Sequence, residues 1–172
     1  EGNGVRKISK RKDPEASMAY YKDKGYPTTA VIEALMTIAN SNYEEWHTQN
    51  PDKKFYEFEF SPKKMSSSGA FFDIDKLDYI SRNIISKMTK DEVYDNLYKW
   101  ADEYNKDFAN IISKDIDYTK AILNIEREQK KPRKDYAYYS DIENQIWYMF
   151  PELFSEHELV YEWGKINNIS TT

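Results

Sequence analysis

The chain has 172 residues, of which 32% are charged and 16% aromatic, and its formal net charge is −5. This length allows a hydrophobic core in one domain or two small ones, and the acidic balance argues against a generally cationic nucleic-acid binder. Cysteine is absent, which excludes disulfides, thiolate metal sites and a cysteine nucleophile and favours a reducing compartment, the cytoplasm. No apolar run is long enough to cross a membrane, so we expect no membrane partner.

Helix start and stop signals are frequent in the first half of the chain. Asp13 and Pro14 predict the start of a helix that Gly25 ends in a left-handed turn. Pro27 opens a second helix, whose expected apolar stripe is Val31, Ile32, Leu35, Met36 and Ala39. A short helical turn is expected at 43–47, and the alternating aromatic and acidic residues at 55–60 allow a short strand or an extended segment.

The second half of the chain continues the helical pattern. A helix is predicted over 73–88, and Thr89 with Glu92 forms a capping-box pattern before an apolar spacing that runs on to Ile111. Further helices are predicted over 115–129, from a second capping box at Ser140 and Glu143 up to Pro151, and over 153–165. The sequence therefore predicts an all-α, mainly helical fold, with two modules, 1–86 and 87–172.

A basic motif lies near the start of the chain, where the first twelve residues contain five basic residues and one acidic residue. Its core, Lys7-Ile8-Ser9-Lys10-Arg11, resembles the second signature motif of class I aminoacyl-tRNA synthetases, in the form common among glutamyl-tRNA synthetases. Two lysines three residues apart on such a loop can offset the charge of a triphosphate.

Later segments extend the resemblance to the glutamyl-tRNA synthetases in family order. They are the continuation 12–16, the stretch Ser66 to Leu77, and the helical region from Pro132 to Phe154. The resemblance implies a C-terminal portion of such an enzyme that lacks the catalytic Rossmann domain. It also implies a stem-contact helical bundle in the first module and the first part of a helical, α-cage-like anticodon-binding region in the second.

The resemblance further implies roles for particular residues. In the full-length parent, Lys7 and Lys10 would be catalytic, and ATP would be bound by Lys7, Ser9, Lys10 and Arg11. The parent would use ATP and Mg²⁺ to attach glutamate to tRNA through a glutamyl-adenylate. We expect this chain alone to be an inactive monomer with no bound cofactor, and the missing N-terminal catalytic domain to be its partner in cis. His47 and His157 are isolated, and no metal site is expected.

A second basic segment offers a contact for tRNA, the expected partner. Four cations occur within five residues, and an arginine and a tyrosine flank them, so we predict that phosphates and bases are contacted here. The predicted tRNA-binding residues are Arg127, Lys130, Lys131, Arg133, Lys134 and Tyr136.

Two other interpretations remain at this point. A class I lysyl-tRNA synthetase shares the signature loop and a helical appendix, although the continuation Lys12-Asp13-Pro14-Glu15 weighs against it. A helical protein-interaction module would show the same aromatic stripes and acidic balance. A synthetase fragment should bind tRNA in a salt-sensitive manner, whereas a protein-interaction module should not.

Overall fold

The computed structural model describes residue 9 and the ranges 11–65 and 72–156. Within these ranges the chain folds into helices and short 3₁₀ turns, without a strand, so the predicted all-α fold is confirmed. The α-helices are α1 (Met18–Lys24), α2 (Thr28–Ala39), α3 (Tyr43–Gln49), α4 (Ile74–Lys87), α5 (Lys90–Tyr104), α6 (Lys106–Lys114), α7 (Ile116–Leu123), α8 (Ser140–Ile146) and α9 (Pro151–Glu156). The 3₁₀ turns are η1 (Pro14–Ala16), η2 (Phe55–Glu57), η3 (Pro62–Lys64) and η4 (Trp147–Met149). In this part of the chain no helix has the length and apolar character needed to cross a membrane.

The first predicted helix is divided into two elements at Ser17. Residues 14–16 form η1, and the hydroxyl of Ser17 then accepts a hydrogen bond from the Ala19 backbone N–H to cap α1. Asp13 occupies the N-cap position of η1, with Pro14 directly after it, as predicted. Its carboxylate makes no capping bond to η1 and accepts the backbone N–H of Ser9 at 2.7 Å. Gly25 ends α1 at φ 77°, as predicted.

Helix α2 begins after Pro27 as predicted, but its buried face differs from the predicted stripe. The face packed along α4 is formed by Ala30, Val31 and Ala34, whereas Leu35 is 46% exposed. The segment after α3 also differs from expectation, because 55–57 form the 3₁₀ turn η2 and no strand follows it among the described residues.

Two strong helix caps define the middle of the molecule. The Asp73 carboxylate accepts the Lys76 backbone N–H at the start of α4, and Thr89 with Glu92 makes the predicted capping box of α5. The predicted continuation to Ile111 is interrupted at Asn105. Its side-chain oxygen caps α6 by accepting the Phe108 N–H at 3.1 Å, and its side-chain nitrogen donates to Glu143 at 2.7 Å.

The last elements are shorter than predicted. Helix α7 ends at Leu123 rather than continuing to residue 129, and α8 ends at Ile146, where η4 follows. The predicted capping box at Ser140 is wrong, because Ser140 is already helical and Glu143 is bonded to Asn105. Pro151 opens α9, and the predicted helix beyond residue 156 lies outside the described residues.

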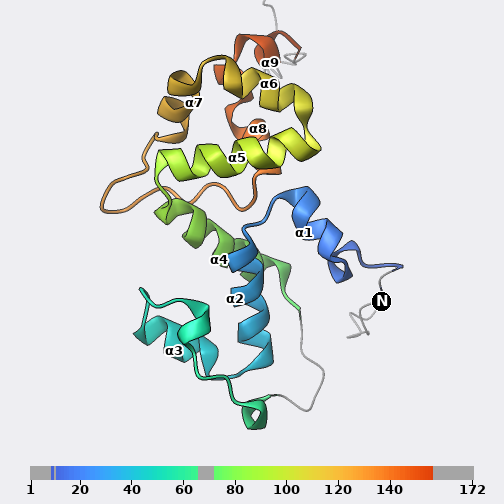
Figure 1. The fold of residues 1–172 in the computed structure, drawn as a ribbon, viewed down its shortest axis with the longest axis vertical. Helices are drawn as coiled ribbons and strands as arrows, with labels where there is room; N and C mark the ends of the chain where they lie inside the picture. Colours follow the sequence, from blue (N-terminus) through green and yellow to red (C-terminus); the bar gives the residue numbers. More distant parts are fainter. Residues whose placement is uncertain (1–8, 10, 66–71, 157–172) are drawn as a thin grey trace, which may run out of the picture.

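The buried side chains form two clusters. The first contains Tyr21, Tyr26, Ala30, Val31, Ala34 and Leu77. The second draws its members from positions 85 to 153 and includes Leu97, Phe108, Ile112 and Ile142, each fully buried. Figure 1 shows α5 to α9 gathered at one end of an elongated molecule and α2 and α3 at the other, with α4 running between them.

Candidate nucleic-acid interface

The residues of the basic N-terminal motif are only partly described. Lys7 and Lys10 lie outside the described residues, whereas Ser9 is half-buried and Arg11 is exposed. The carbonyl of Ser9 accepts the backbone N–H groups of Lys12 and Asp13, both at 2.9 Å. The motif therefore enters η1 through a hydrogen-bonded turn that the 95% buried Asp13 holds in place.

The second basic segment lies beside the joint between α4 and α5. Because α7 ends early, residues 124–139 return across the molecule as an extended loop, and Figure 1 shows this loop beside the end of α4. The loop and the joint enclose an open groove of about 810 Å³, which we call the lysine groove. Its basic lining residues are Lys87, Lys130, Lys131 and Lys134.

The lysines of this groove are available to a ligand. All four are exposed, and among the residues that the structure describes none of them forms an ion pair with a carboxylate. The groove also contains one acidic residue, Glu128, whose carboxylate accepts the Lys90 backbone N–H at 3.0 Å. That carboxylate faces the first turn of α5, where the helix dipole favours negative charge. The surface that remains is cationic in a chain that is acidic overall.

Arg127 is not part of this exposed surface, although the sequence places it among the tRNA-binding residues. It is 7% exposed, and its guanidinium donates to the backbone oxygens of Leu123 at 2.8 Å, Ile85 at 2.6 Å and Met88 at 3.3 Å. Burial lowers the pKa of this guanidinium, which still remains charged at neutral pH. Arg127 therefore fastens the loop after α7 to the end of α4.

Arg133 lies on the surface but is already paired with acidic groups. Its Nε is 2.6 Å from the Asp135 carboxylate and 3.5 Å from that of Glu126. The charge of Asp135, together with this hydrogen bond, raises the pKa of Arg133. Its backbone N–H also donates to the Glu126 carbonyl at 3.0 Å, so the residue closes the loop on itself. A phosphate would have to compete with two carboxylates for this guanidinium.

Tyr136 is half-buried, and its ring packs against the second cluster. The guanidinium carbon of Arg127 lies 5.8 Å from the ring centroid, a cation–π arrangement within the protein. Burial raises the pKa of the Tyr136 hydroxyl. The ring thus supports Arg127 and presents only part of its surface to a base.

Lys87 was missed by the reasoning from sequence. It is the last residue of α4, and the loop that completes the groove comes from more than forty positions later. Its local signal is weak, because a lysine in the last turn of a helix is common and is explained by the helix dipole alone. Only the fold brings it beside Lys130, Lys131 and Lys134.

Comparisons with known proteins identify relatives of this chain. A glutamate–tRNA ligase of Acetivibrio thermocellus is 49% identical over 154 residues, which are 89% of this chain and 28% of the relative. A glutamate–tRNA ligase of Clostridium perfringens is 43% identical over 156 residues, or 91% of this chain and 29% of the relative. A third, from Sorangium cellulosum, is 41% identical over 149 residues, or 87% and 26%. No family model and no solved structure matches the chain.

The chain is helical, it has an exposed cationic groove, and its relatives are tRNA ligases. These observations place it among the aminoacyl-tRNA synthetases. Within that class it belongs to the glutamate–tRNA ligase family, as the resemblance implied. The lysyl-tRNA synthetase alternative is not favoured by these relatives. The chain spans about 28% of the length of the relatives that it matches, as expected for a portion of a longer enzyme.

Proposed function

We propose that this chain is a tRNA-binding portion of a glutamate–tRNA ligase and that the lysine groove contacts the tRNA backbone. The observation that carries the proposal is the gathering of four exposed lysines, none in an ion pair with a carboxylate of the described residues, around one groove of an acidic chain. The names of the relatives support tRNA as the polyanion.

The physical basis of the proposal is electrostatic. Each phosphate that a lysine neutralises releases condensed counterions, so affinity falls steeply as the salt concentration rises. Because such contacts carry no sequence information, the groove would fix the position of the RNA and leave base selection to other residues. In this account Lys130, Lys131, Lys134 and Lys87 contact phosphates, Arg133 contributes less, and Arg127 acts through the loop.

The activity belongs to the longer enzyme. In that enzyme, glutamate would be attached to tRNA through a glutamyl-adenylate, with ATP and Mg²⁺ supplying the activation. Lys7, Ser9, Lys10 and Arg11 would bind ATP, and Lys7 and Lys10 would offset charge on the leaving pyrophosphate. Of these four residues the structure describes Ser9 and Arg11.

The remaining features of the proposal concern organisation. Residues 1–86 would contact the stem of the tRNA, and residues 87–172 would form the first part of the anticodon-binding region. The catalytic domain would act in cis, and the chain alone would be an inactive monomer in the cytoplasm. The two buried clusters support a division near the end of α4.

Binding of a fluorescently labelled tRNA-Glu transcript to the 172-residue chain tests the proposal. Fluorescence anisotropy at low salt should report saturable binding, and Lys131→Glu with Lys134→Glu should weaken it by more than about tenfold. The matched control is Lys22→Glu with Lys99→Glu, two exposed lysines that do not line the groove. Equal loss in both double variants, or no binding by the unchanged chain, would contradict the proposal.

A further inference from the structure

A second recess lies at the opposite end of the molecule, between α3 and the segment that follows η2. It has a volume of about 440 Å³, within the range of small-ligand sites. The residues that matter for its chemistry are Asn42, Glu45, Trp46, Gln49, Phe58 and Lys64. We call it the Trp46 pocket.

The aromatic wall of the Trp46 pocket is held in place by ring contacts. The Trp46 and Phe58 rings meet edge to face, with centroids 5.3 Å apart and an interplanar angle of 62°. Both rings also pack on Tyr43, which is 1% exposed, with centroids 5.9 Å and 5.2 Å away. Trp46 itself is only half-buried, so part of its indole remains open to a ligand.

Asn40 fixes the backbone at the base of the pocket. It is 1% exposed, and its side-chain nitrogen donates to the Ser61 carbonyl at 3.0 Å. This bond ties the segment that carries Phe58 to the end of α2. A ligand would therefore meet a preformed wall, which lowers the ordering cost of binding.

The polar groups at the rim match the edge of a nucleobase better than a phosphate. Asn42 and Gln49 each carry an amide that both donates and accepts hydrogen bonds. The Gln49 nitrogen donates to the Glu45 carboxylate, and the Asn42 oxygen accepts the Ser41 hydroxyl, each at 3.3 Å. An amide has two N–H donors and two acceptor lone pairs, so each group keeps hydrogen-bonding capacity for a base. Two carboxylates, those of Glu45 and Glu59, and one ammonium, that of Lys64, line the same recess. This balance is unfavourable for a phosphate, whereas an aromatic face beside amides is the usual site for an unstacked base.

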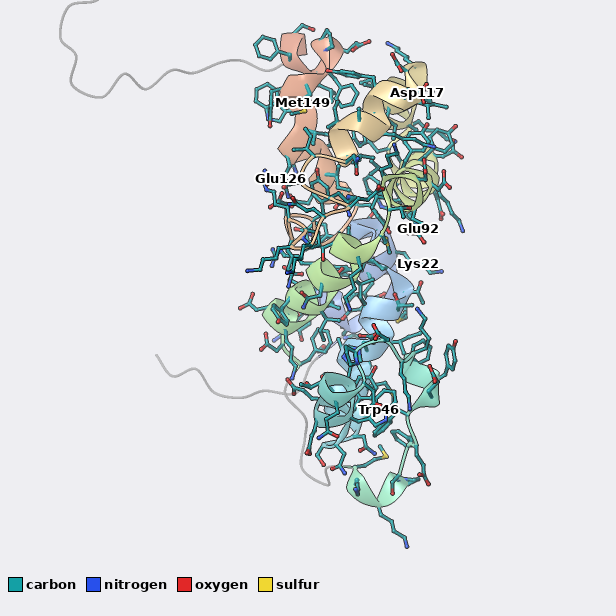
Figure 2. The ribbon with its side chains drawn as sticks, turned by 90° about the vertical axis from the view of Figure 1, so that its left-hand side faces the viewer. Lys22, Trp46, Glu92, Asp117, Glu126 and Met149 are labelled. Atoms are coloured by element: carbon teal, nitrogen blue, oxygen red, sulfur yellow. The ribbon has the colours of Figure 1, made fainter. Side chains whose placement is uncertain are left out.

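The elements that carry the Trp46 pocket and the lysine groove lie along one edge of the molecule. In Figure 1, α3 and the loop after α7 both lie at the left-hand edge. Figure 2 looks onto that edge, with Trp46 labelled in its lower half and Glu126 in its upper half. Glu126 lies near the start of the loop 124–139, which carries Lys130, Lys131 and Lys134 and which we call the lysine loop. An RNA that runs along this edge would pass both elements.

We propose that the Trp46 pocket binds one unpaired nucleobase of the RNA whose backbone lies in the lysine groove. This inference rests on the proposed function. The base stacks on the indole of Trp46, and its edge is bonded by Gln49 and Asn42. The groove supplies affinity that depends on salt, and the pocket supplies a stacking contact that salt hardly affects.

The test measures tRNA-Glu transcript affinity over a series of salt concentrations for the 172-residue chain and its variants. Trp46→Ala should weaken binding by about 5-fold to 150-fold without changing the slope of log K against log salt. Trp46→Phe, which keeps a ring, should recover most of that loss. Gln49→Ala, an exposed change that leaves all rings in place, should weaken binding by about 2-fold to 10-fold.

The control is Tyr56→Ala, which removes a 72% exposed aromatic ring outside the pocket and should leave affinity within about twofold. If Trp46→Ala does not fold by circular dichroism, Gln49→Ala decides the question. Unchanged affinity in folded Trp46→Ala, or in Gln49→Ala where Trp46→Ala does not fold, while Lys131→Ala still weakens binding, would overturn the pocket and leave the proposed function intact. Absence of tRNA binding by the unchanged chain would overturn both.

Discussion

The indole nitrogen of Trp100 donates a hydrogen bond of 2.9 Å to the backbone oxygen of Asp23, 77 residues earlier in the chain. Close by, the Tyr139 N–H donates to the Gly25 carbonyl at 3.0 Å. The end of α1 is therefore enclosed between α5 and the segment that leads into α8. These two bonds join the N-terminal helices to the second cluster.

Gly25→Ala should disrupt this junction. The residue adopts φ 77°, and an added Cβ would lie 2.8 Å from Cδ1 of Trp100 and 2.9 Å from Cβ of Tyr139. Left-handed backbone strain and overpacking together predict a loss of about 2–4 kcal/mol in the free energy of unfolding. Urea denaturation measures it, with Asp23→Ala as an exposed control that keeps the backbone carbonyl. A loss below about 0.5 kcal/mol for Gly25→Ala would show that the junction adapts easily.

Arg127→Lys should destabilise the chain even though it conserves charge. A lysine ammonium cannot present the planar fork that reaches the carbonyls of Leu123, Ile85 and Met88. We expect a loss of about 1.5–3 kcal/mol in the free energy of unfolding, because buried carbonyls lose a charged donor. Chemical denaturation is the measurement, and Arg133→Lys at the exposed, ion-paired position should change stability by less than about 1 kcal/mol.

A second variant, Arg127→Gln, separates a structural role from direct contact with RNA. If Arg127 only positions the loop that carries Lys130, Lys131 and Lys134, Arg127→Gln lowers tRNA affinity without changing the salt slope. If Arg127 contacted a phosphate, Arg127→Gln would reduce that slope by about one. A reduced slope in a folded Arg127→Gln variant would contradict the buried role assigned here.

Tyr43→Phe should leave the chain as stable as before or more stable near neutral pH. The Tyr43 hydroxyl is buried without a hydrogen-bond partner among the described residues, and removing such a group relieves a cost of about 1–3 kcal/mol. Burial, and then the charge of Glu33, raises the pKa of Tyr43 to about 12. Urea denaturation measures the difference, and Tyr56→Phe is the exposed control.

The sign of the pH effect follows from that shift. A tyrosine whose pKa is raised by folding contributes stability that is complete below its unfolded pKa of about 10 and is lost as pH rises through the folded value. Tyr43→Phe lacks this loss, so its advantage over the unchanged chain should grow between about pH 10 and about pH 12. An advantage that stays constant over this interval would contradict the buried environment of the hydroxyl.

Local signals in the sequence predicted much of the helical framework. Asp73, Thr89 with Glu92, and Gly25 act at helix ends as their side chains or backbone freedom dictate, since these effects depend only on neighbouring residues. The break at Asn105 was missed because apolar residues keep helical spacing on both sides of it. The Asn105 side chain ends one helix and caps the next, and it is held by a hydrogen bond to Glu143, 38 residues away. A contact at that sequence distance gives no local signal.

The candidate site was less predictable for a related reason. The composition of the basic segment indicated a cationic loop. Whether each basic side chain is exposed, buried or ion-paired depends on residues that the fold brings beside it. Arg127 bonds a carbonyl 42 residues earlier, and Lys87 joins the groove only because α4 ends beside that loop. Composition alone gives Arg127 and Lys131 the same charge, whereas burial gives them different roles.

The slope of log K against log salt for tRNA-Glu binding tests the central claim most directly. We compare the unchanged chain with the triple variant Lys130→Ala, Lys131→Ala, Lys134→Ala and with the control Lys22→Ala, Lys63→Ala, Lys99→Ala. If the groove contacts the RNA backbone, the slope, which is negative, should become shallower in the groove variant by about two to three units, roughly 0.7–0.9 per lysine. The control should keep the original slope. Equal slopes for all three proteins would contradict an RNA contact in the lysine groove.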